Sequence, residues 1–257
     1  MTIALAPVDV PVDPMVAATL LERVRTRRPR VHCLMNTVVQ KFVADGVTAV
    51  GGIPSMTASE EEVGAFVRRA DSLAVNLGTL DAARRRAIGL AVEVAGTESK
   101  PWIVDPVHCD YSPSRLAFAQ TLAALGPAAV RGNAAEMMAL GLQAGAPCAP
   151  GLVITTGPVD RLVTARRSLR IENGDRLMAG VTGTGCLAGA VIAAFLAVEP
   201  DAQLAAAAAL STTGVAAELA APGVRGPASF GIAFLDVLAT LSPDELLTHA
   251  RIFDDRT

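Results

Sequence analysis

Short apolar runs alternate with longer segments of helical period along the first part of the chain. Each run is followed by polar residues or glycine before the helical period begins. Strands that alternate with helices are typical of βαβ units, which build a parallel sheet. The pattern predicts five such strands, at Val31–Leu34, Leu73–Leu77, Trp102–Val104, Ala128–Val130 and Leu152–Thr155.

The pattern changes after Gly157. The apolar runs become short and closely spaced, and they predict strands at Arg161–Ala165, Ser168–Ile171 and Arg176–Val181. Between the last two runs, Asn173-Gly174 is a strong signal for a tight hairpin turn. We therefore expect antiparallel edge strands on an otherwise parallel sheet.

Beyond Gly183 the chain has the pattern of helices almost throughout. The expected helices are Cys186–Val198, Ala202–Ala220, Phe230–Leu241 and Asp244–Arg251. No linker rich in serine and glycine and no internal repeat divides the sequence. Residues 15–257 are accordingly predicted to form one domain.

The first 14 residues differ from the rest. They carry several prolines and no apolar period, which predicts an irregular extension, and Asp13 and Pro14 are placed to begin a helix. Acidic residues and prolines stand where a secretory signal would have a basic start and an apolar stretch. The four cysteines are scattered without a CxxC pair, which favours a reducing cytoplasm. They are Cys33, Cys109, Cys148 and Cys186.

Composition makes two kinds of partner unexpected. Among 257 residues, 51% are hydrophobic, which is enough for a sizeable core. The net charge of −3 lacks the broad positive field that nucleic acid binding needs. The mean hydropathy of +0.42 comes largely from alanine, and Glu199–Asp201 and Glu218 interrupt the longest apolar stretches. We therefore expect no membrane-spanning segment.

The segment from Val181 to Cys186 is the most informative for chemistry. It follows a predicted strand and opens a long helix, and Gly183 and Gly185 let the backbone turn so that several amides converge. Such a turn at a helix N-terminus can bind a phosphate or a developing oxyanion. Cys186 in the first helical turn would feel the positive end of the helix dipole, which favours its thiolate. The lysine of a Walker A motif is absent.

Two further motifs follow predicted strands. Arg131 ends one strand, and Asn133 can cap the helix that contains Glu136. Arg131 suits phosphate, and Glu136 could hold a magnesium ion or its water, although an ordinary strand-to-helix turn with a solvated arginine explains the motif equally well. Asp105 lies at the carboxyl end of another strand, where α/β sheets place ligands, or it could be a simple turn aspartate.

These motifs, in this order and with Thr156 between the second and the glycine turn, resemble the hydroxyethylthiazole kinases, which have the ribokinase-like fold. The resemblance extends from about Val31 to Leu241. It includes five further segments, Val31–Asn36, Gly52–Met56, Val75–Leu80, Thr213–Ala217 and Gly226–Phe230.

The resemblance implies a role for each matching residue. Asn36 and Met56 match residues that bind the thiazole, and Gly183 and Cys186 match positions near its hydroxyl. The amides of Gly183 and Gly185 would act on the transferring phosphoryl group. Cys186 stands where other ribokinase-like enzymes place an aspartate as general base.

On the nucleotide side, Arg131 and Thr156 match residues that bind ATP, the co-substrate, and Asp105 and Glu136 match the acidic positions near Mg²⁺. The resemblance also implies a homotrimer with substrate pockets between subunits. The expected activity is phosphorylation of the hydroxyl of 4-methyl-5-(2-hydroxyethyl)thiazole by ATP.

Two departures from the family pattern leave alternatives open. His108–Tyr111 replaces a glycine-rich loop, and a short stretch replaces a helix between Glu136 and Val153. Both lie on the nucleotide side. A homologue that binds the thiazole or a thiamine precursor without turnover is therefore one alternative, and a kinase of hydroxymethylpyrimidine is another. A zinc site at His32-Cys33 or His108–Asp110 is not expected, because adjacent strand residues point to opposite faces.

Overall fold

The computed structural model describes residues 12–142 and 151–255. In this part of the chain, nine strands form one sheet in the order β2-β1-β3-β4-β5-β6-β7-β8-β9. The first six in that order are parallel, and β7, β8 and β9 are antiparallel. The parallel strands are β1 Arg30–Leu34, β2 Ile53–Ser55, β3 Ser72–Asn76, β4 Trp102–Asp105, β5 Ala129–Asn133 and β6 Val153–Thr156. The antiparallel strands are β7 Asp160–Val163, β8 Ser168–Ile171 and β9 Ile252–Asp254.

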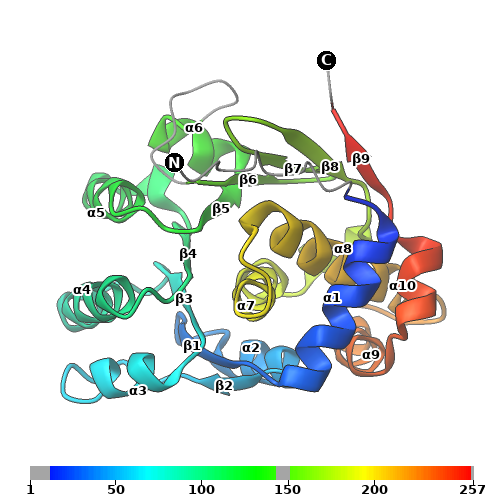
Figure 1. The fold of residues 1–257 in the computed structure, drawn as a ribbon, viewed down its shortest axis with the longest axis horizontal. Helices are drawn as coiled ribbons and strands as arrows, with labels where there is room; N and C mark the ends of the chain where they lie inside the picture. Colours follow the sequence, from blue (N-terminus) through cyan, green and yellow to red (C-terminus); the bar gives the residue numbers. More distant parts are fainter. Residues whose placement is uncertain (1–11, 143–150, 256–257) are drawn as a thin grey trace, which may run out of the picture.

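Helices cover both faces of the sheet (Figure 1). One face carries α3 Val63–Arg69, α4 Ala82–Thr97, α5 Pro113–Ala124 and α6 Ala134–Leu140. The other face carries α2 Gln40–Ala49, α7 Thr184–Leu196 and α8 Ala202–Ala220. Outside α2 and α8 lie α1 Pro14–Arg27, α9 Pro227–Thr240 and α10 Pro243–His249. Two short 3-10 helices, η1 Cys109–Tyr111 and η2 Arg176–Gly180, complete the described elements.

The two faces of the sheet bury separate apolar clusters. In β3, Ala74 belongs to the cluster with α7, whereas Leu73 and Val75 belong to the cluster with α4. This alternation follows from the two-residue period of a strand. The helix α7 consists mainly of small and apolar residues and packs directly against β1, β3 and β4. Its N-terminus is thereby brought to the carboxyl edge of the sheet.

The predicted strand at Arg176–Val181 is wrong, because residues 176–180 form η2. Asn173 does not make a hairpin turn. Its side chain donates to Glu218 and to the carbonyl of His249, and accepts from the amide of Arg251. These contacts hold the chain against α8, so it leaves the sheet after β8.

The strand β9 takes the predicted edge position, pairing with β8. This segment lies after Arg251, where the sequence predicted the last helix to end, and α10 in fact ends at His249. The three-residue strand β2 was also not predicted, since it contains Pro54 and is too short to show alternation. The other predicted strands and helices are confirmed with shifts of a few residues at their ends.

The start of α1 agrees with the sequence. Pro14 is its first residue, and the Asp13 side chain accepts a hydrogen bond from Val16 N at 3.1 Å. The irregular extension predicted for residues 1–14 falls mostly outside the described residues, as does most of the shortened stretch before β6. None of the described helices is both long and apolar enough to cross a membrane.

Candidate active site

Polar side chains gather where the parallel strands end. Asn76 is the last residue of β3, and Asp105 is the last residue of β4 beside it in register. Arg131 lies in β5, next to β4, and Asn36 lies just beyond β1. Ligands of open α/β sheets bind at this carboxyl edge. The N-terminus of α7 brings Cys186 to the same place.

Hydrogen bonds connect these side chains into one network. Asn36 Nδ2 donates to Asn76 Oδ1 at 3.1 Å, and Asn76 Nδ2 donates to Asp105 Oδ2 at 3.2 Å. Arg131 Nη1 donates to the same Asp105 oxygen at 3.3 Å. The Cys186 sulfur accepts from Asn76 Nδ2 at 3.2 Å and from Asn36 Nδ2 at 3.6 Å. Residues predicted for the thiazole and for the nucleotide therefore belong to one continuous network.

The helix dipole was expected to favour the thiolate of Cys186, but the surroundings of the side chain favour the neutral thiol. Burial, with a smaller contribution from the carboxylate of Asp105, raises the pKa of the Cys186 thiol to about 11. These effects outweigh the favourable charge of Arg131 and the hydrogen bonds from Asn76 and Asn36. Near neutral pH, Cys186 is a neutral thiol.

Asp105 and Arg131 form a buried ion pair. Their side chains are only 7% and 12% exposed. Burial raises the pKa of Asp105, and the charge of Arg131 opposes that shift. Arg131 Nε is buried and has no hydrogen-bond partner. The guanidinium therefore keeps a donor for which the protein provides no acceptor.

Glycines allow the turn before α7 to lie close to its neighbours. Gly183 has φ +104°, and a Cβ there would lie 2.9 Å from Val39 Cγ1. A Cβ at Gly185 would lie 3.1 Å from Arg131 Nη2. No side chain caps α7, so its first amides are not occupied by a cap. This geometry suits an anion held between the guanidinium and the helix N-terminus.

Glu136 caps the helix in which it lies. Its Oε2 accepts from Asn133 N at 2.8 Å, and Asn133 Oδ1 accepts from Glu136 N at 3.0 Å. Its Oε1 accepts from His108 N at 2.7 Å. Possible ligand atoms of His108, Asp110 and Glu136 lie within 4.8 Å of one another.

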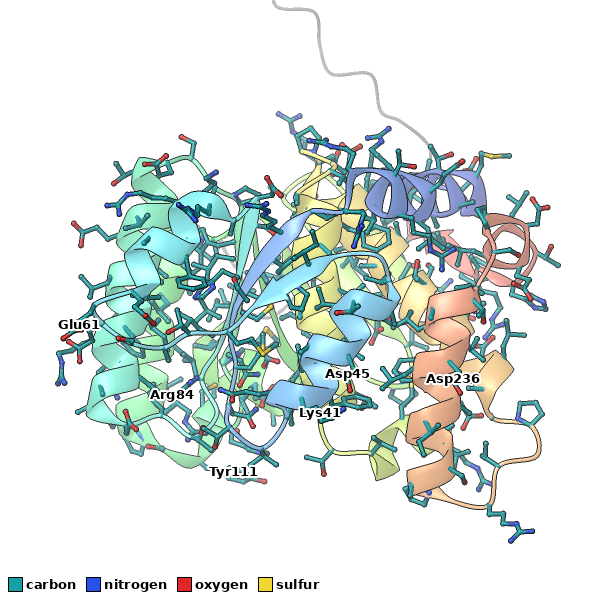
Figure 2. All side chains as sticks on the ribbon, turned by 90° about the horizontal axis from the view of Figure 1, so that it is seen from below. Lys41, Asp45, Glu61, Arg84, Tyr111 and Asp236 are labelled. Atoms are coloured by element: carbon teal, nitrogen blue, oxygen red, sulfur yellow. The ribbon has the colours of Figure 1, made fainter. Side chains whose placement is uncertain are left out.

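The segment at His108–Tyr111 is a turn, so the strand argument against zinc does not apply there. His108 has φ +55°, and η1 follows it. The rings of His108 and Tyr111 stack with centroids 4.9 Å apart. Tyr111 is 77% exposed and lies at the edge of the molecule in Figure 2. The bulk of the tyrosine is thus directed to the surface.

A cavity of about 630 Å³ opens beside Arg131 and Gly185. It is also lined by Thr156, whose hydroxyl donates to the carbonyl of Gly132 at 3.3 Å. Asp160 lies in the same wall, where burial raises its pKa and Gly157 N donates to its carboxylate at 3.0 Å. The position of the cavity on the arginine side suits a nucleotide.

Met56 lies apart from the hydrogen-bonded network. It is partly buried against the apolar cluster of α2 and α7, as is Cys186. Its thioether offers an apolar contact surface rather than a hydrogen bond.

A second cavity, of about 580 Å³, lies at the opposite edge of the sheet. Its lining includes Asp71, Lys100 and Trp102, near the amino ends of β3 and β4. The network described above is not part of it. The carboxyl edge therefore remains the candidate site.

Asn76 and Asp160 were not predicted as site residues from the sequence. Asn76 accompanies Asp105 and Cys186 in the network, and Asp160 lines the cavity. A polar residue that ends an otherwise apolar strand beside the strand of Asp105 was the available signal for Asn76. Asp160 follows a glycine turn and gave no comparable signal.

Known proteins resemble this chain closely. A sequence profile of the hydroxyethylthiazole kinase family matches residues 21–148 and 142–244. A probable hydroxyethylthiazole kinase from Agrobacterium fabrum (strain C58) is 61% identical over 237 residues, with 92% of this chain and 94% of the relative covered.

Solved structures agree. A hydroxyethylthiazole kinase protein from Pyrococcus horikoshii OT3 superposes with a TM-score of 0.88 at 33% identity, covering 93% of this chain and 99% of that one. A ribokinase-like superfamily protein from Enterococcus faecalis V583 shares the fold, with a TM-score of 0.65 at 14% identity and coverage of 88% and 95%. The predicted ribokinase-like fold is confirmed, and the chain belongs to the hydroxyethylthiazole kinase family.

Proposed function

We propose that this site transfers the terminal phosphoryl group of ATP to the hydroxyl of 4-methyl-5-(2-hydroxyethyl)thiazole. Family membership supports the substrate and the reaction. The observation that carries the proposal is the continuous network from Asn36 and Cys186, through Asn76 and Asp105, to Arg131. It joins the side expected for the alcohol to the cavity expected for the nucleotide.

Arg131 and the turn before α7 would stabilise the transferring group. The Arg131 guanidinium, which lines the cavity, and the uncapped amides at Gly183 and Gly185 would be donors for phosphate oxygens. Phosphoryl transfer proceeds through a loose transition state with charge on these oxygens, so positioning and charge neutralisation supply most of the catalysis. Thr156 would contact the nucleotide from the wall of the cavity.

Asn36, Met56 and Cys186 would form the thiazole side. Asn36 is 7% exposed and already oriented by Asn76, so its amide is held in place before substrate arrives. Met56 would contact the ring, and the Cys186 thiol would lie near the hydroxyl. Because that thiol is neutral, we assign it a packing role rather than that of a strong base.

Asp105 and Glu136 would hold Mg²⁺ or its waters. Carboxylate oxygens are the donors that Mg²⁺ prefers, and the ion commonly takes one or two of them together with substrate phosphates. Asp105 borders the Arg131 guanidinium, and Glu136 lies in the first turn of α6, which follows β5. When bound, the ion neutralises negative charge on the phosphates.

We further propose a homotrimer with its substrate pockets between subunits, each subunit formed by residues 15–257 as one domain. Val38 supports the association, since this apolar residue is 72% exposed and its amide donates to Asn36 Oδ1 at 3.2 Å. A neighbouring subunit would cover Val38 and close the thiazole pocket. A reducing cytoplasm remains the expected location, and Cys33, Cys109 and Cys186 are free thiols.

An assay of ADP release with two alcohols tests the proposal. The purified protein, ATP and Mg²⁺ should form ADP in proportion to added thiazole alcohol and much less with hydroxymethylpyrimidine. Preference for the pyrimidine would identify a different alcohol kinase. Thiazole binding without ADP at any magnesium concentration would identify a binding protein.

A further inference from the structure

The imidazole of His32 has no part in the reaction described above, yet both its nitrogens have partners. His32 lies on β1 and is 0% exposed. Its Nδ1 is 2.8 Å from Ser55 Oγ, and its Nε2 is 3.1 Å from the carbonyl oxygen of Thr57. Ser55 is the last residue of β2 and pairs with His32 in register.

The partners determine which nitrogen carries the proton. A carbonyl oxygen only accepts, so Nε2 is protonated and donates to Thr57. Nδ1 is then the acceptor, and the Ser55 hydroxyl donates to it. Burial lowers the pKa of His32 to about 4, so the ring stays neutral near neutral pH. This single neutral tautomer satisfies both contacts.

The two contacts lie on either side of Met56. The pairing of β1 with β2 ends at Ser55, so it does not restrain the residues that follow. Thr57 Oγ1 donates to Glu62 Oε2 at 2.9 Å, but that bond is exposed to solvent. His32 therefore restrains the chain on both sides of Met56, through the Ser55 side chain and the Thr57 backbone, with two hydrogen bonds that are less exposed than the bond to Glu62.

The His32 ring lies on the face of the sheet that α3 covers, opposite to the face on which Met56 packs. The imidazole lies 5.8 Å from the ring of Phe66 on α3. Met56 packs on the other face, against the cluster of α2 and α7. His32 can therefore orient the segment of Met56 without reaching the substrate pocket itself.

We propose that His32 is a positioning residue, which holds Ser55–Thr57 so that Met56 presents a fixed surface to the thiazole ring. The inference rests on the proposed function, because it takes Met56 as a contact of the thiazole. A segment that is already ordered loses little conformational entropy when the substrate binds, so the binding free energy is not reduced by that cost. The effect should therefore appear in thiazole affinity and not in the use of ATP.

Three variants separate the two contacts. His32→Phe keeps a ring of similar size and loses both hydrogen bonds, His32→Gln keeps a donor that reaches toward Thr57, and Ser55→Ala removes one hydroxyl. We expect His32→Phe to raise the KM for thiazole roughly ten-fold, with a smaller rise for His32→Gln and Ser55→Ala. The KM for ATP should stay unchanged in all three.

A second readout is independent of catalysis. With methionine labelled by ¹³C at its methyl group, the NMR signal of Met56 is assigned by its loss in Met56→Leu. In His32→Phe this signal should shift or broaden without any substrate present. Val67→Ala is the matched control, since Val67 is buried in α3 on the same face of the sheet as His32. It should lower the melting temperature yet leave the signal and both KM values unchanged.

A folded His32→Phe variant with the parent's thiazole KM and an unchanged Met56 signal would overturn the proposal. So would an equal rise of both KM values, which would mark a general structural role. If His32→Phe does not fold, the thiazole KM and the Met56 signal of His32→Gln and Ser55→Ala test the proposal in the same way. A parent protein that never phosphorylates the thiazole contradicts the proposed function alone, because the Met56 signal still tests the restraint.

Discussion

Cys186 stands in the first turn of α7, where the helix dipole favours a thiolate, but burial and Asp105 raise its pKa to about 11. The loss of hydration is the larger effect at this position. The position of Cys186 in the sequence predicts the effect of the helix dipole, but it does not show how deeply the thiol is buried. The side chain therefore contributes shape and a weak hydrogen-bond acceptor to the site.

Cys186→Ala should keep kcat within about ten-fold of the parent, short of the ~10²–10⁴-fold that general-base catalysis contributes. Because the thiol stays protonated well above neutral pH, kcat from about pH 7 to about pH 9 should show no ionisation that the alanine variant lacks. Cys33→Ala, which removes a buried thiol outside the hydrogen-bonded network, is the control for loss of a cysteine. A pH step present only in the parent would assign the proton acceptor to Cys186.

Arg131→Ala should affect both stability and nucleotide use. It leaves Asp105 as an unpaired buried carboxylate, which should cost about 3–5 kcal/mol of unfolding free energy. Adding Asp105→Asn should recover part of that loss, as denaturant unfolding would measure. The KM for ATP should rise by the equivalent of about 1.5–3 kcal/mol, with thiazole affinity without nucleotide nearly unchanged. An unchanged kcat/KM for ATP would show that Arg131 is only structural.

Sequence indicated much of the candidate site because Asp105 and Arg131 each follow or end an apolar run. Their meeting is a consequence of neighbouring parallel strands. Asn76 was missed because its role appears only in the register that sets it beside Asp105. The contact of Glu136 with the amide of His108 was not predicted either, since it joins the first turn of α6 to the turn before η1, which are separate in the sequence.

Helices and strands were predictable where the apolar pattern of the sequence matches the burial of the element in the fold. Parallel strands buried on both faces give unbroken apolar runs, as in β3. The run at Arg176–Val181 failed because a tertiary contact, from Asn173 to Glu218, overrides the turn signal. The strand β9 was not predicted because it has only three residues, too few to show alternation, and follows a helix directly.

Gly214→Ala tests how closely α8 must approach the segment after β8 that contains Asn173. A Cβ at Gly214 would lie 2.6 Å from Asn173 Cβ, and Asn173 lines the nucleotide cavity. We expect a loss of about 1–3 kcal/mol in stability and a raised KM for ATP. Gly89→Ala, in α4 with nothing within 4 Å of the added Cβ, should instead stabilise by about 0.5–1 kcal/mol. Equal stability of the two variants would contradict the close packing.

For the whole molecule, the order of elements predicted a mostly parallel sheet with antiparallel edge strands, and the resemblance carried by the ordered motifs implied the ribokinase-like fold. The sheet brings residues from five strand ends and one helix to one edge, so the site depends on the complete fold. Association between chains has no comparable sequence pattern. It was expected from the family resemblance, and Val38 is the exposed apolar residue at which we propose that the subunits meet.

Val38→Asp should weaken the proposed trimer and lower thiazole affinity, because a charge would be buried where subunits meet. Sedimentation velocity would show the parent as a trimer and the variant as smaller species. Leu125→Asp is a matched control, since Leu125 is 59% exposed at the opposite edge of the sheet. A parent protein that is active as a monomer would contradict the intersubunit pocket.

Phosphoryl transfer to the thiazole alcohol is measured most directly by ³¹P NMR of the protein with ATP, Mg²⁺ and the alcohol. A phosphate monoester resonance should grow in the same amount as ADP, and it should be absent when the alcohol is left out. ADP accompanied by inorganic phosphate instead of the ester would contradict transfer. So would bound thiazole with no ester at any magnesium concentration.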